Sequence, residues 1–413
     1  MVKPWRLARA AALAVAAVVL LAPALACAST YVSHHRRYHR HHRAVHRAAH
    51  VPLYHGALLE DAGTGRVLYA YNAGMEWPPA SMAKMTLLLV TEEQIRQGRV
   101  HLSDPVRISE RSAHTSGSRL GLREGQVFPL GELMKAALVK SANDAAVAVA
   151  EKIGGSVEGA VRMMNAQAKA LGMKHTEFHT VDGLPPRPGH DVDRTTAYDL
   201  AIVARALIHR TPLLQWSSHS KLPFDGGRCM LHNTNHLIGH FYGCDGLKTG
   251  FTWQAGFNVT VTAKRGDMRL VGVILGAPSN AERFIQAAKL LNWGFANFTA
   301  VPLLRSGQVL PVTVQVRSGP AVRPYAAHAL NVVVRKSTAD AVQVVYDVPH
   351  SVVGPVYTGE PLGQVVVRDG ASVVTEMPAL CPIDFRPAAL TPFDRGQAER
   401  NAAAARNYGD EGY

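Results

Sequence analysis

Cysteine is scarce in this chain, with four residues in 413. They are Cys27, Cys229, Cys244 and Cys381, and no two of them form a Cys-x-x-Cys pair, which argues against a structural zinc site. Cys229 and Cys244 are spaced to close a short loop by a disulfide in an oxidising compartment. Two separate buried thiols account for them equally well. We expect no bound metal and no cofactor.

A hydrophobic run long enough to span a membrane is also missing. The apolar stretch over residues 10–21 is too short to favour a spanning helix, and Pro23 ends it. Basic residues precede this stretch and small residues follow it, which is typical of a secretory signal over residues 1–26. We therefore expect an exported protein, in the periplasm or at the outer face of the cytoplasmic membrane. Cys27 follows directly, so a lipid-modified cysteine is an alternative.

Acidic residues are fewer than basic ones, 31 against 44, which gives a formal net charge of +13. Much of the surplus lies near the start, where residues 27–50 are rich in histidine and arginine. This stretch has no apolar periodicity and is predicted to be a disordered arm. A solvated linker is the first interpretation. Binding to anionic envelope polymers or lipid head groups is the second, and adventitious metal binding is the third. We expect no nucleic-acid partner for an exported chain.

The apolar pattern predicts an α+β domain over residues 51–300. Its strands are expected at both ends of the segment, where apolar residues alternate, and helices are expected between them. One sheet would then be built from the two ends. The expected strands cover residues 57–60, 66–70, 247–252, 257–264 and 268–275. The expected helices cover residues 81–98, 130–153 with an interruption at 140–144, 157–171, 195–209 and 281–297.

A second, all-β domain is predicted over residues 301–386. Its expected strands cover residues 312–316, 331–335, 342–346 and 364–367, and no helical period is visible. Residues 387–413 are predicted to be a polar tail with nothing apolar enough to anchor in a bilayer.

Ser81 and Lys84 form the first candidate catalytic pair. They are three residues apart at the start of a predicted helix, so they lie on one face and can touch. A neutral lysine can take the proton of a serine hydroxyl and so make it a nucleophile. Alone this pattern is weak, because Ser218 and Lys221 have the same spacing. We interpret that second pair, in a short polar stretch, as incidental.

Two further motifs follow at characteristic distances. Ser141 and Asn143 lie between helical stretches 60 residues after Ser81, and residues 248–250 read Lys-Thr-Gly on a predicted strand 107 residues further on. In order, spacing and context, the three motifs resemble those of the D-alanyl-D-alanine carboxypeptidases, the low-molecular-mass penicillin-binding proteins. Ala142 stands where the middle motif often has aspartate. The resemblance covers residues 53–385 and includes the stretches 60–65, 245–250 and 289–295.

This resemblance implies a penicillin-binding-protein/β-lactamase-like transpeptidase domain, with an antiparallel sheet, helices and a helical lobe, followed by a smaller β domain. It implies a serine-type D-Ala-D-Ala carboxypeptidase that removes the terminal D-alanine from peptidoglycan pentapeptide stems during cell-wall remodelling. β-Lactam antibiotics would then be inhibitors.

The resemblance also implies a role for each motif residue. Ser81 would form the acyl-enzyme, and Lys84 would accept its proton, with a pKa lowered by burial and by the ammonium of Lys248. Ser141 would relay a proton to the leaving amine, and Asn143 would hold a substrate carbonyl. The substrate carboxylate would bind Lys248, Thr249 and Arg283, Gly250 would let the peptide lie against the strand, and the backbone N–H groups of Ser81 and Phe251 would form the oxyanion hole.

Three features depart from the family pattern. Residues 180–184 replace its usual Asn-Pro turn, Phe251 makes the edge of the pocket more apolar, and an amphipathic C-terminal anchor is missing. Asp144 is interpreted as structural. Scattered histidines such as His101, His114 and His179 have no matched partners and are not interpreted as ligands or bases.

Three alternatives stay open. A β-lactamase shares the motifs, but no glutamate in this chain has an asparagine four residues on, which is the deacylating pattern of one such class. A D-alanyl-D-alanine endopeptidase uses the same groups and differs in the shape of its pocket. A non-catalytic envelope scaffold is the third alternative, and the complete set of motifs argues against it.

Overall fold

The computed structural model describes residues 52–185, residues 191–386 and residue 396. The predicted signal, Cys27 and the predicted basic arm lie outside the described residues, as does nearly all of the predicted tail. Within the described part of the chain, none of the helices has the length and apolar character needed to cross a membrane.

A five-stranded antiparallel sheet organises the first part of the fold, in the order β2-β1-β9-β8-β7. The prediction that both ends of the segment build one sheet is therefore confirmed, and β7 lies at its edge. The strands are β1 (Gly56–Asp61), β2 (Val67–Tyr71), β7 (Cys244–Thr252), β8 (Gly256–Arg265) and β9 (Met268–Ala277).

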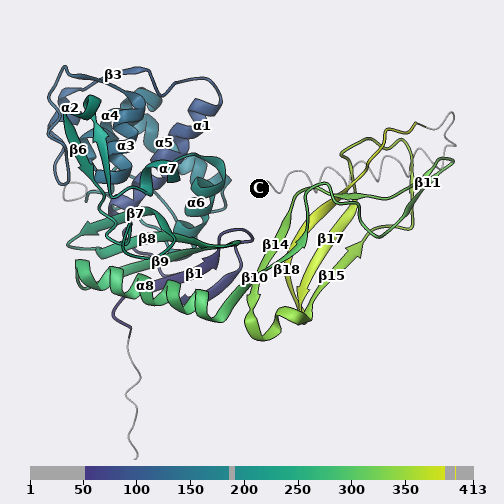
Figure 1. Cartoon of the computed structure of the whole chain (residues 1–413). Coiled ribbons are helices and arrows are strands. Elements are labelled where there is room, and N and C mark those ends of the chain that lie inside the picture. Colours follow the sequence, from purple (N-terminus) through teal and green to yellow (C-terminus); the bar gives the residue numbers. More distant parts are fainter. Residues whose placement is uncertain (1–51, 186–190, 387–395, 397–413) are drawn as a thin grey trace, which may run out of the picture. The chain divides into compact units, whose positions relative to one another are not determined.

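Each face of this sheet carries its own apolar core, because successive side chains of a strand point to opposite faces. Leu58 and Val273 pack with helices of the lobe that contains α1 (Lys84–Arg96) and α6 (Ala197–Arg210). Leu59 and Val261 pack on the other face with α8 (Asn280–Asn297), which Figure 1 shows running along the sheet. The sheet is therefore buried on both sides, and residue pairs next to each other in sequence serve different cores.

The long helices agree with the predicted ones within a few residues, whereas the short helices α2, α7 and η3 were not predicted. The expected break near residue 141 is present, because α3 passes into a π-helical turn (η2) and the next helix starts only at Asn143. The helices are η1 (Ala80–Ala83), α1 (Lys84–Arg96), α2 (Glu110–Ala113), α3 (Leu130–Lys135), η2 (Ala136–Lys140), α4 (Asn143–Gly154), α5 (Val157–Ala170), α6 (Ala197–Arg210), α7 (Leu214–Ser217), η3 (Asp225–Gly227) and α8 (Asn280–Asn297).

Two short two-stranded sheets were not predicted, since strands of three or four residues show too little alternation. They are β3 (Pro105–Arg107) with β4 (Val127–Pro129), and β5 (Lys221–Phe224) with β6 (Cys229–His232). Cys229 is exposed on β6, and Cys244 at the start of β7 is half-buried. Both are free thiols, so the structure favours separate thiols over the short-loop disulfide.

The part that follows is rich in strands, as predicted, and it also contains the 3-10 helix η4. η4 buries no residue, so it leaves no apolar period in the sequence. The predicted domain boundary at residue 300 falls inside β10, which pairs with β14. The elements are β10 (Phe298–Leu304), β11 (Val314–Arg317), β12 (Ala321–Val322), β13 (Tyr325–Ala326), β14 (Leu330–Arg335), η4 (Lys336–Ala341), β15 (Val342–Asp347), β16 (Ser351–Val353), β17 (Pro361–Asp369) and β18 (Ser372–Leu380).

Candidate active site

Ser81 lies in the 3-10 turn η1, directly before α1 begins at Lys84. The Nζ of Lys84 donates to the Oγ of Ser81 at 2.9 Å and to the backbone carbonyl of Asp182 at 2.7 Å. Lys84 is fully buried, whereas Ser81 is half-buried and reaches the surface. The predicted serine–lysine contact is therefore present, at the boundary between the core and solvent.

Burial is the main influence on the ammonium of Lys84, because a charge inside the protein loses its hydration. It lowers the pKa of Lys84 to about 8, against the opposing effect of the carboxylates of Asp182, Asp193 and Asp144. A neutral lysine is accordingly accessible near neutral pH. The sequence predicted this lowering, and burial is its leading cause.

A second serine–lysine pair is formed by Ser141 and Lys248. The Nζ of Lys248, on β7, donates to the Oγ of Ser141 at 2.7 Å and to the backbone carbonyl of Thr249 at 2.9 Å. Ser141 is buried and has a left-handed backbone with φ of 63°. This conformation is uncommon for a residue with a side chain, and here it ends η2 and directs the hydroxyl toward the sheet.

Lys248 is also fully buried, and its pKa lies well below the usual value. Burial is the largest cause, followed by the positive charges of Lys84 and Arg283. Repulsion from the neighbouring positive charges therefore adds to burial in disfavouring the charged form of Lys248. An anion bound beside Lys248 would favour its charged form again.

Asn143 and Asp144 begin α4 and point in different directions. The Nδ2 of Asn143 donates to the carbonyl of Ser116 at 2.7 Å, and its Oδ1 is buried without a protein partner. The Asp144 carboxylate accepts backbone N–H groups from residues 120–122, at distances of 2.8 to 3.2 Å, and from Ala145 at 2.9 Å. Asp144 therefore holds the loop before the site, which fits its interpretation as structural.

Strand β7 lies against the turn that carries Ser81, the predicted nucleophile. A Cβ on Gly250 would come within 2.6 Å of the carbonyl oxygen of Pro79, so only glycine allows this approach. Asn258, fully buried on β8, was missed by the sequence analysis. Its Nδ2 donates to the Pro78 carbonyl at 2.9 Å, and its Oδ1 accepts from the N–H of Gly276 at 2.8 Å. One amide thus connects the nucleophile turn to two strands.

Arg283 lies near the start of α8 and is buried against the sheet. Its Nη1 donates to the backbone carbonyls of Gly250 at 3.0 Å and Asn258 at 3.1 Å, and its Nη2 bonds Asn280. Burial lowers its pKa to about 10. Its observed contacts therefore support the backbone of β7 and β8 next to Thr249.

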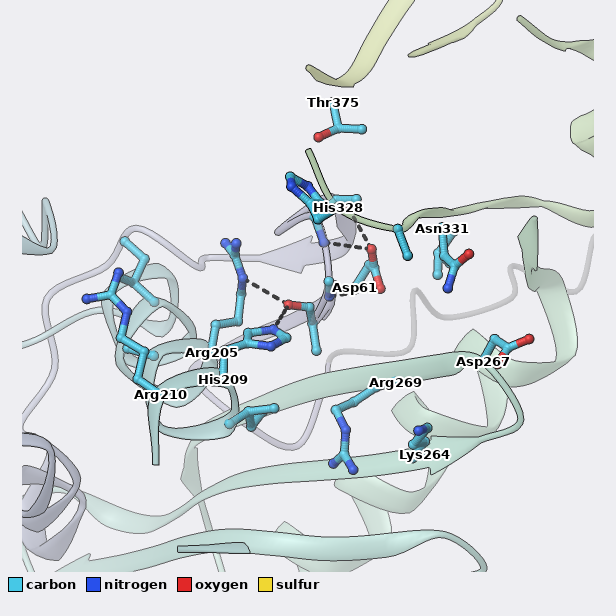
Figure 2. Close-up of a pocket in the computed structure, with 18 of the residues that line it drawn as sticks. Asp61, Arg205, His209, Arg210, Lys264, Asp267, Arg269, His328, Asn331 and Thr375 are labelled. Atoms are coloured by element: carbon cyan, nitrogen blue, oxygen red, sulfur yellow. Dashed lines mark hydrogen bonds between the residues drawn. The ribbon is translucent and has the colours of Figure 1, made fainter. Parts of the chain in front are cut away.

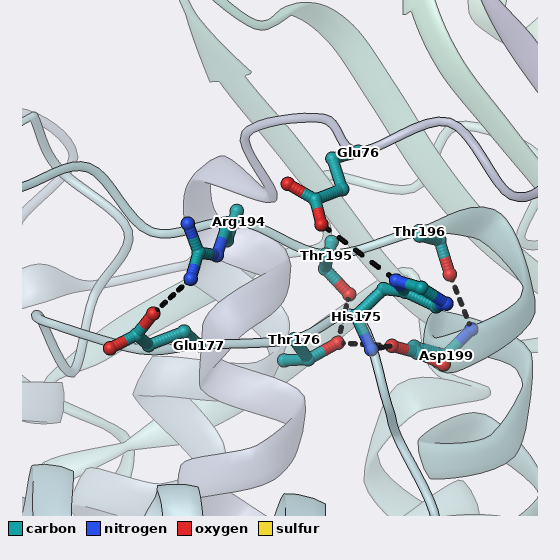
Figure 3. A network of polar contacts seen from close by, with 8 residues as sticks. All are labelled: Glu76, His175, Thr176, Glu177, Arg194, Thr195, Thr196 and Asp199. Atoms are coloured by element: carbon teal, nitrogen blue, oxygen red, sulfur yellow. Dashed lines mark hydrogen bonds and ion pairs between the residues drawn. The ribbon is translucent and has the colours of Figure 1, made fainter.

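The turn over residues 180–184, which departs from the family pattern, is what places the Asp182 carbonyl on Lys84. The Asp193 carboxylate fixes this turn by accepting from the N–H groups of His179 and Thr180 at 2.7 and 2.9 Å. Figure 3 shows the polar network at the base of this loop, where Thr176 bonds both Thr195 and Asp199. The loop is thereby tied to the start of α6.

Gly183→Ala is expected to lower activity at least tenfold. Gly183 has φ of +78°, and a Cβ there would lie 1.8 Å from the carbonyl oxygen of Ala80, so the loop or the nucleophile turn must move. Gly172→Ala is the matched control, since it has φ of +76° and open space around its Cβ position. Steady-state kinetics of both variants, with circular dichroism for folding, test this. Equal effects of the two changes would contradict it.

The second serine–lysine spacing, Ser218 and Lys221, lies outside the cluster that holds Ser81, Lys84, Ser141 and Lys248. The Oγ of Ser218 is 3.3 Å from the Nδ1 of His219, and Lys221 is exposed on β5. No group of three or more metal-ligating side chains occurs within residues 52–185 and 191–386.

A pocket of about 1210 Å³ contains none of the predicted site residues. There Arg205 and His209 donate to the carbonyl of Ala62, and so hold the β1–β2 turn (Figure 2).

Comparison with known proteins extends this picture. A family model described as D-alanyl-D-alanine carboxypeptidase matches residues 48–279. The chain is 32% identical to D-alanyl-D-alanine carboxypeptidase DacF of Bacillus subtilis over 343 residues, which are 82% of this chain and 87% of that protein. It is 35% identical to DacC of Escherichia coli over 251 residues, 59% of this chain and 62% of that protein.

Solved structures show the same likeness. Penicillin-binding protein 5 of Haemophilus influenzae matches 81% of this chain and 97% of its own, with a TM-score of 0.72 and 28% identity. Penicillin-binding protein D2 of Listeria monocytogenes, in an ampicillin-bound form, matches 59% of this chain and 98% of its own, with a TM-score of 0.55 and 30% identity.

Proposed function

The chain belongs to the D-alanyl-D-alanine carboxypeptidase family, and we propose that its two serine–lysine pairs carry out the reaction of that family. Membership confirms the predicted family, the predicted fold class and the prediction of a serine-type carboxypeptidase acting on peptidoglycan. The observation that carries the proposed roles is the contact between Ser81 and a buried Lys84 whose pKa is about 8.

In the proposed first step, the Oγ of Ser81 attacks the carbonyl carbon between the two terminal D-alanines while neutral Lys84 takes its proton. The backbone N–H groups of Ser81 and Phe251 bind the oxyanion. The C–N bond then breaks, and a proton delivered through Ser141 allows the terminal D-alanine to leave as an amine. Water hydrolyses the resulting ester and returns Ser81 to its free form.

The substrate carboxylate is proposed to bind Lys248 and Thr249. Lys248 is buried with a lowered pKa, so a carboxylate beside it restores a favourable charged state. Arg283 contributes through its bonds to the Gly250 and Asn258 carbonyls, which hold the strand in place. The amide of Asn143 uses one N–H on Ser116, which leaves a second N–H for a substrate carbonyl.

The location proposed for this reaction is outside the cytoplasm, in the periplasm or at the outer face of the membrane. The peptidoglycan substrate of the family supports it. The reaction itself needs no metal or cofactor, because the serine, the lysines and the backbone N–H groups supply every proton transfer and charge contact in the scheme.

The test combines a fluorescent penicillin with an assay of D-alanine release. We expect the wild-type protein to be labelled at Ser81 and to release D-alanine from a pentapeptide ending in D-Ala-D-Ala, and Ser81→Ala to do neither. Labelling of Ser81→Ala, or absence of D-alanine release by the wild type, would contradict the proposed roles. An endopeptidase would instead cleave a cross-linked dimer faster than the pentapeptide.

A further inference from the structure

The two charged side chains proposed to act on the substrate carboxylate already donate to protein groups. The side chain of Lys248 is fully buried and donates to Ser141 and to the Thr249 carbonyl. The Nη1 of Arg283 donates to two backbone carbonyls, and its Nη2 bonds a side chain of its own helix. Most of the N–H donors of these two side chains are therefore engaged before a ligand binds.

A hydroxyl from outside β7 lies directly beside Thr249. The Oγ1 of Thr249 donates to the Oγ1 of Thr234 at 2.7 Å. Thr249 is buried, whereas Thr234, in the segment before β7, is half-buried and reaches the surface. A threonine hydroxyl has one proton and two lone pairs, so Thr234 accepts this bond and still has its own proton to donate. Within the part of the chain that the structure describes, that proton has no acceptor.

The residues on both sides hold Thr234 in place. Its backbone N–H donates to the Val139 carbonyl of η2 at 3.0 Å. Asn235 is buried, and its Nδ2 donates to the Gly246 carbonyl of β7 at 2.9 Å. Asn233 donates to two backbone carbonyls at and just after the end of α7, both at 2.9 Å. Threonine is also β-branched, which restricts its χ1 angle. The hydroxyl is therefore positioned between η2 and β7 before any ligand binds.

We propose that Thr234 is a further binding residue for the terminal carboxylate of the substrate, and that its hydroxyl and that of Thr249 each donate to one carboxylate oxygen. The inference rests on the proposed function, which puts this carboxylate at Lys248 and Thr249. On binding, Thr249 turns its proton from Thr234 to the ligand. The bond lost between two neutral hydroxyls is replaced by charge-assisted bonds, which are shorter and stronger.

The first experiment compares Thr234→Val with the wild type on a peptide ending in D-Ala-D-Ala. Valine has nearly the shape of threonine and lacks its hydroxyl. We expect kcat/KM to fall roughly ten- to thirtyfold, as is typical of losing a hydrogen bond to a charged group. Thr234→Ser restores the hydroxyl and should stay within about threefold of the wild type. Thr211→Val is the matched control and should stay within twofold, because Thr211 is also half-buried and its hydroxyl bonds the Leu207 carbonyl, outside the site, at 2.7 Å.

A pair of ester substrates tests whether Thr234 acts on the carboxylate. The D-lactate ester of N-acetyl-D-alanine ends in a carboxylate, and the ethyl ester has a hydrogen in its place. Thr234→Val should lower kcat/KM for the lactate ester as it does for the peptide, and leave the ethyl ester within twofold. Equal losses on the two esters, or no loss on either, would overturn the inference while the wild type still releases D-alanine from the pentapeptide. A wild type that released none would instead overturn the proposed function.

A double-variant cycle separates a direct bond from an effect that acts only through Thr249. In the Thr249→Val background, Thr234→Val should still lower kcat/KM for the lactate ester at least fivefold, because its hydroxyl meets the carboxylate itself. If the second substitution had no effect in that background, Thr234 would only orient Thr249, and the proposed direct bond would be wrong.

Discussion

Replacing Lys84 by alanine is expected to slow acylation of Ser81 by about a thousandfold, which is typical of losing a positioned general base. The side chain is fully buried and bonds only the Ser81 hydroxyl and the Asp182 carbonyl among the contacts described above. Water has no ready place to substitute for it in that setting. The rate is measured with a fluorescent penicillin under single-turnover conditions.

The same base predicts the pH dependence of the wild-type enzyme. In the proposed mechanism Lys84 acts in its neutral form, so kcat/KM should rise with pH and level off above its pKa of about 8. At pH 7 roughly a tenth of the enzyme would have neutral Lys84, and at pH 9 roughly nine tenths. A flat profile between pH 6.5 and 9.5, or a fall across that range, would contradict the assignment.

Lys221→Ala is the control for the expected loss of acylation in Lys84→Ala. It removes the lysine of the second serine–lysine spacing, which is exposed on β5. We expect its acylation rate to stay within twofold of the wild type, because Lys221 is an exposed residue of β5 outside the cluster of Ser81, Lys84, Ser141 and Lys248. A large loss in Lys221→Ala would mean that the motif spacing was assigned to the wrong pair.

Asp144→Ala is expected to destabilise the fold by about 2–4 kcal/mol and to lower Tm by roughly 4–16 °C. The carboxylate is fully buried and accepts four backbone N–H groups, three of them from the loop over residues 120–122. Alanine leaves those donors without an acceptor. Thermal unfolding followed by circular dichroism measures the change.

Two further variants are controls for the thermal unfolding of Asp144→Ala. Asp267→Ala removes an exposed carboxylate from the β8–β9 turn and should leave Tm within about 2 °C of the wild type. Asp144→Asn keeps one oxygen acceptor of the same shape and should lose less stability than Asp144→Ala. If Asp144→Ala melted at the wild-type temperature, the carboxylate would not be what holds the loop.

Much of the fold follows from local patterns. Alternating apolar residues marked β8, an apolar run marked β9, and an apolar stripe marked α8 over its whole length. The two strands are buried on both faces and the helix on one, in cores that extend over many residues. β18 escaped notice, since Thr375, Glu376 and Pro378 interrupt its apolar pattern. Its place comes from pairing along β17, a contact that no short window of sequence records.

The residues of the candidate site also divide into those with a local sequence signal and those without one. Ser81, Ser141 and Lys248 could be found because their chemistry depends on residue type at fixed spacing. Asn258 and the carbonyl of Asp182 could not, since an amide in a strand and a backbone oxygen in a loop have no distinguishing signal. Their importance arises only when residues about 100 or 180 positions apart are brought together.

The close approach of Gly250 to Pro79 has a consequence for the length of the departing group. Because the backbone of β7 packs on the turn that carries Ser81, the separation between Ser81 and the proposed carboxylate position at Thr249 is set by backbone packing and not by adjustable side chains. One residue extends only about 3.5 Å. With this separation fixed, the bond that Ser81 would attack lies one residue from the free carboxylate. The proposed reaction therefore removes a single residue.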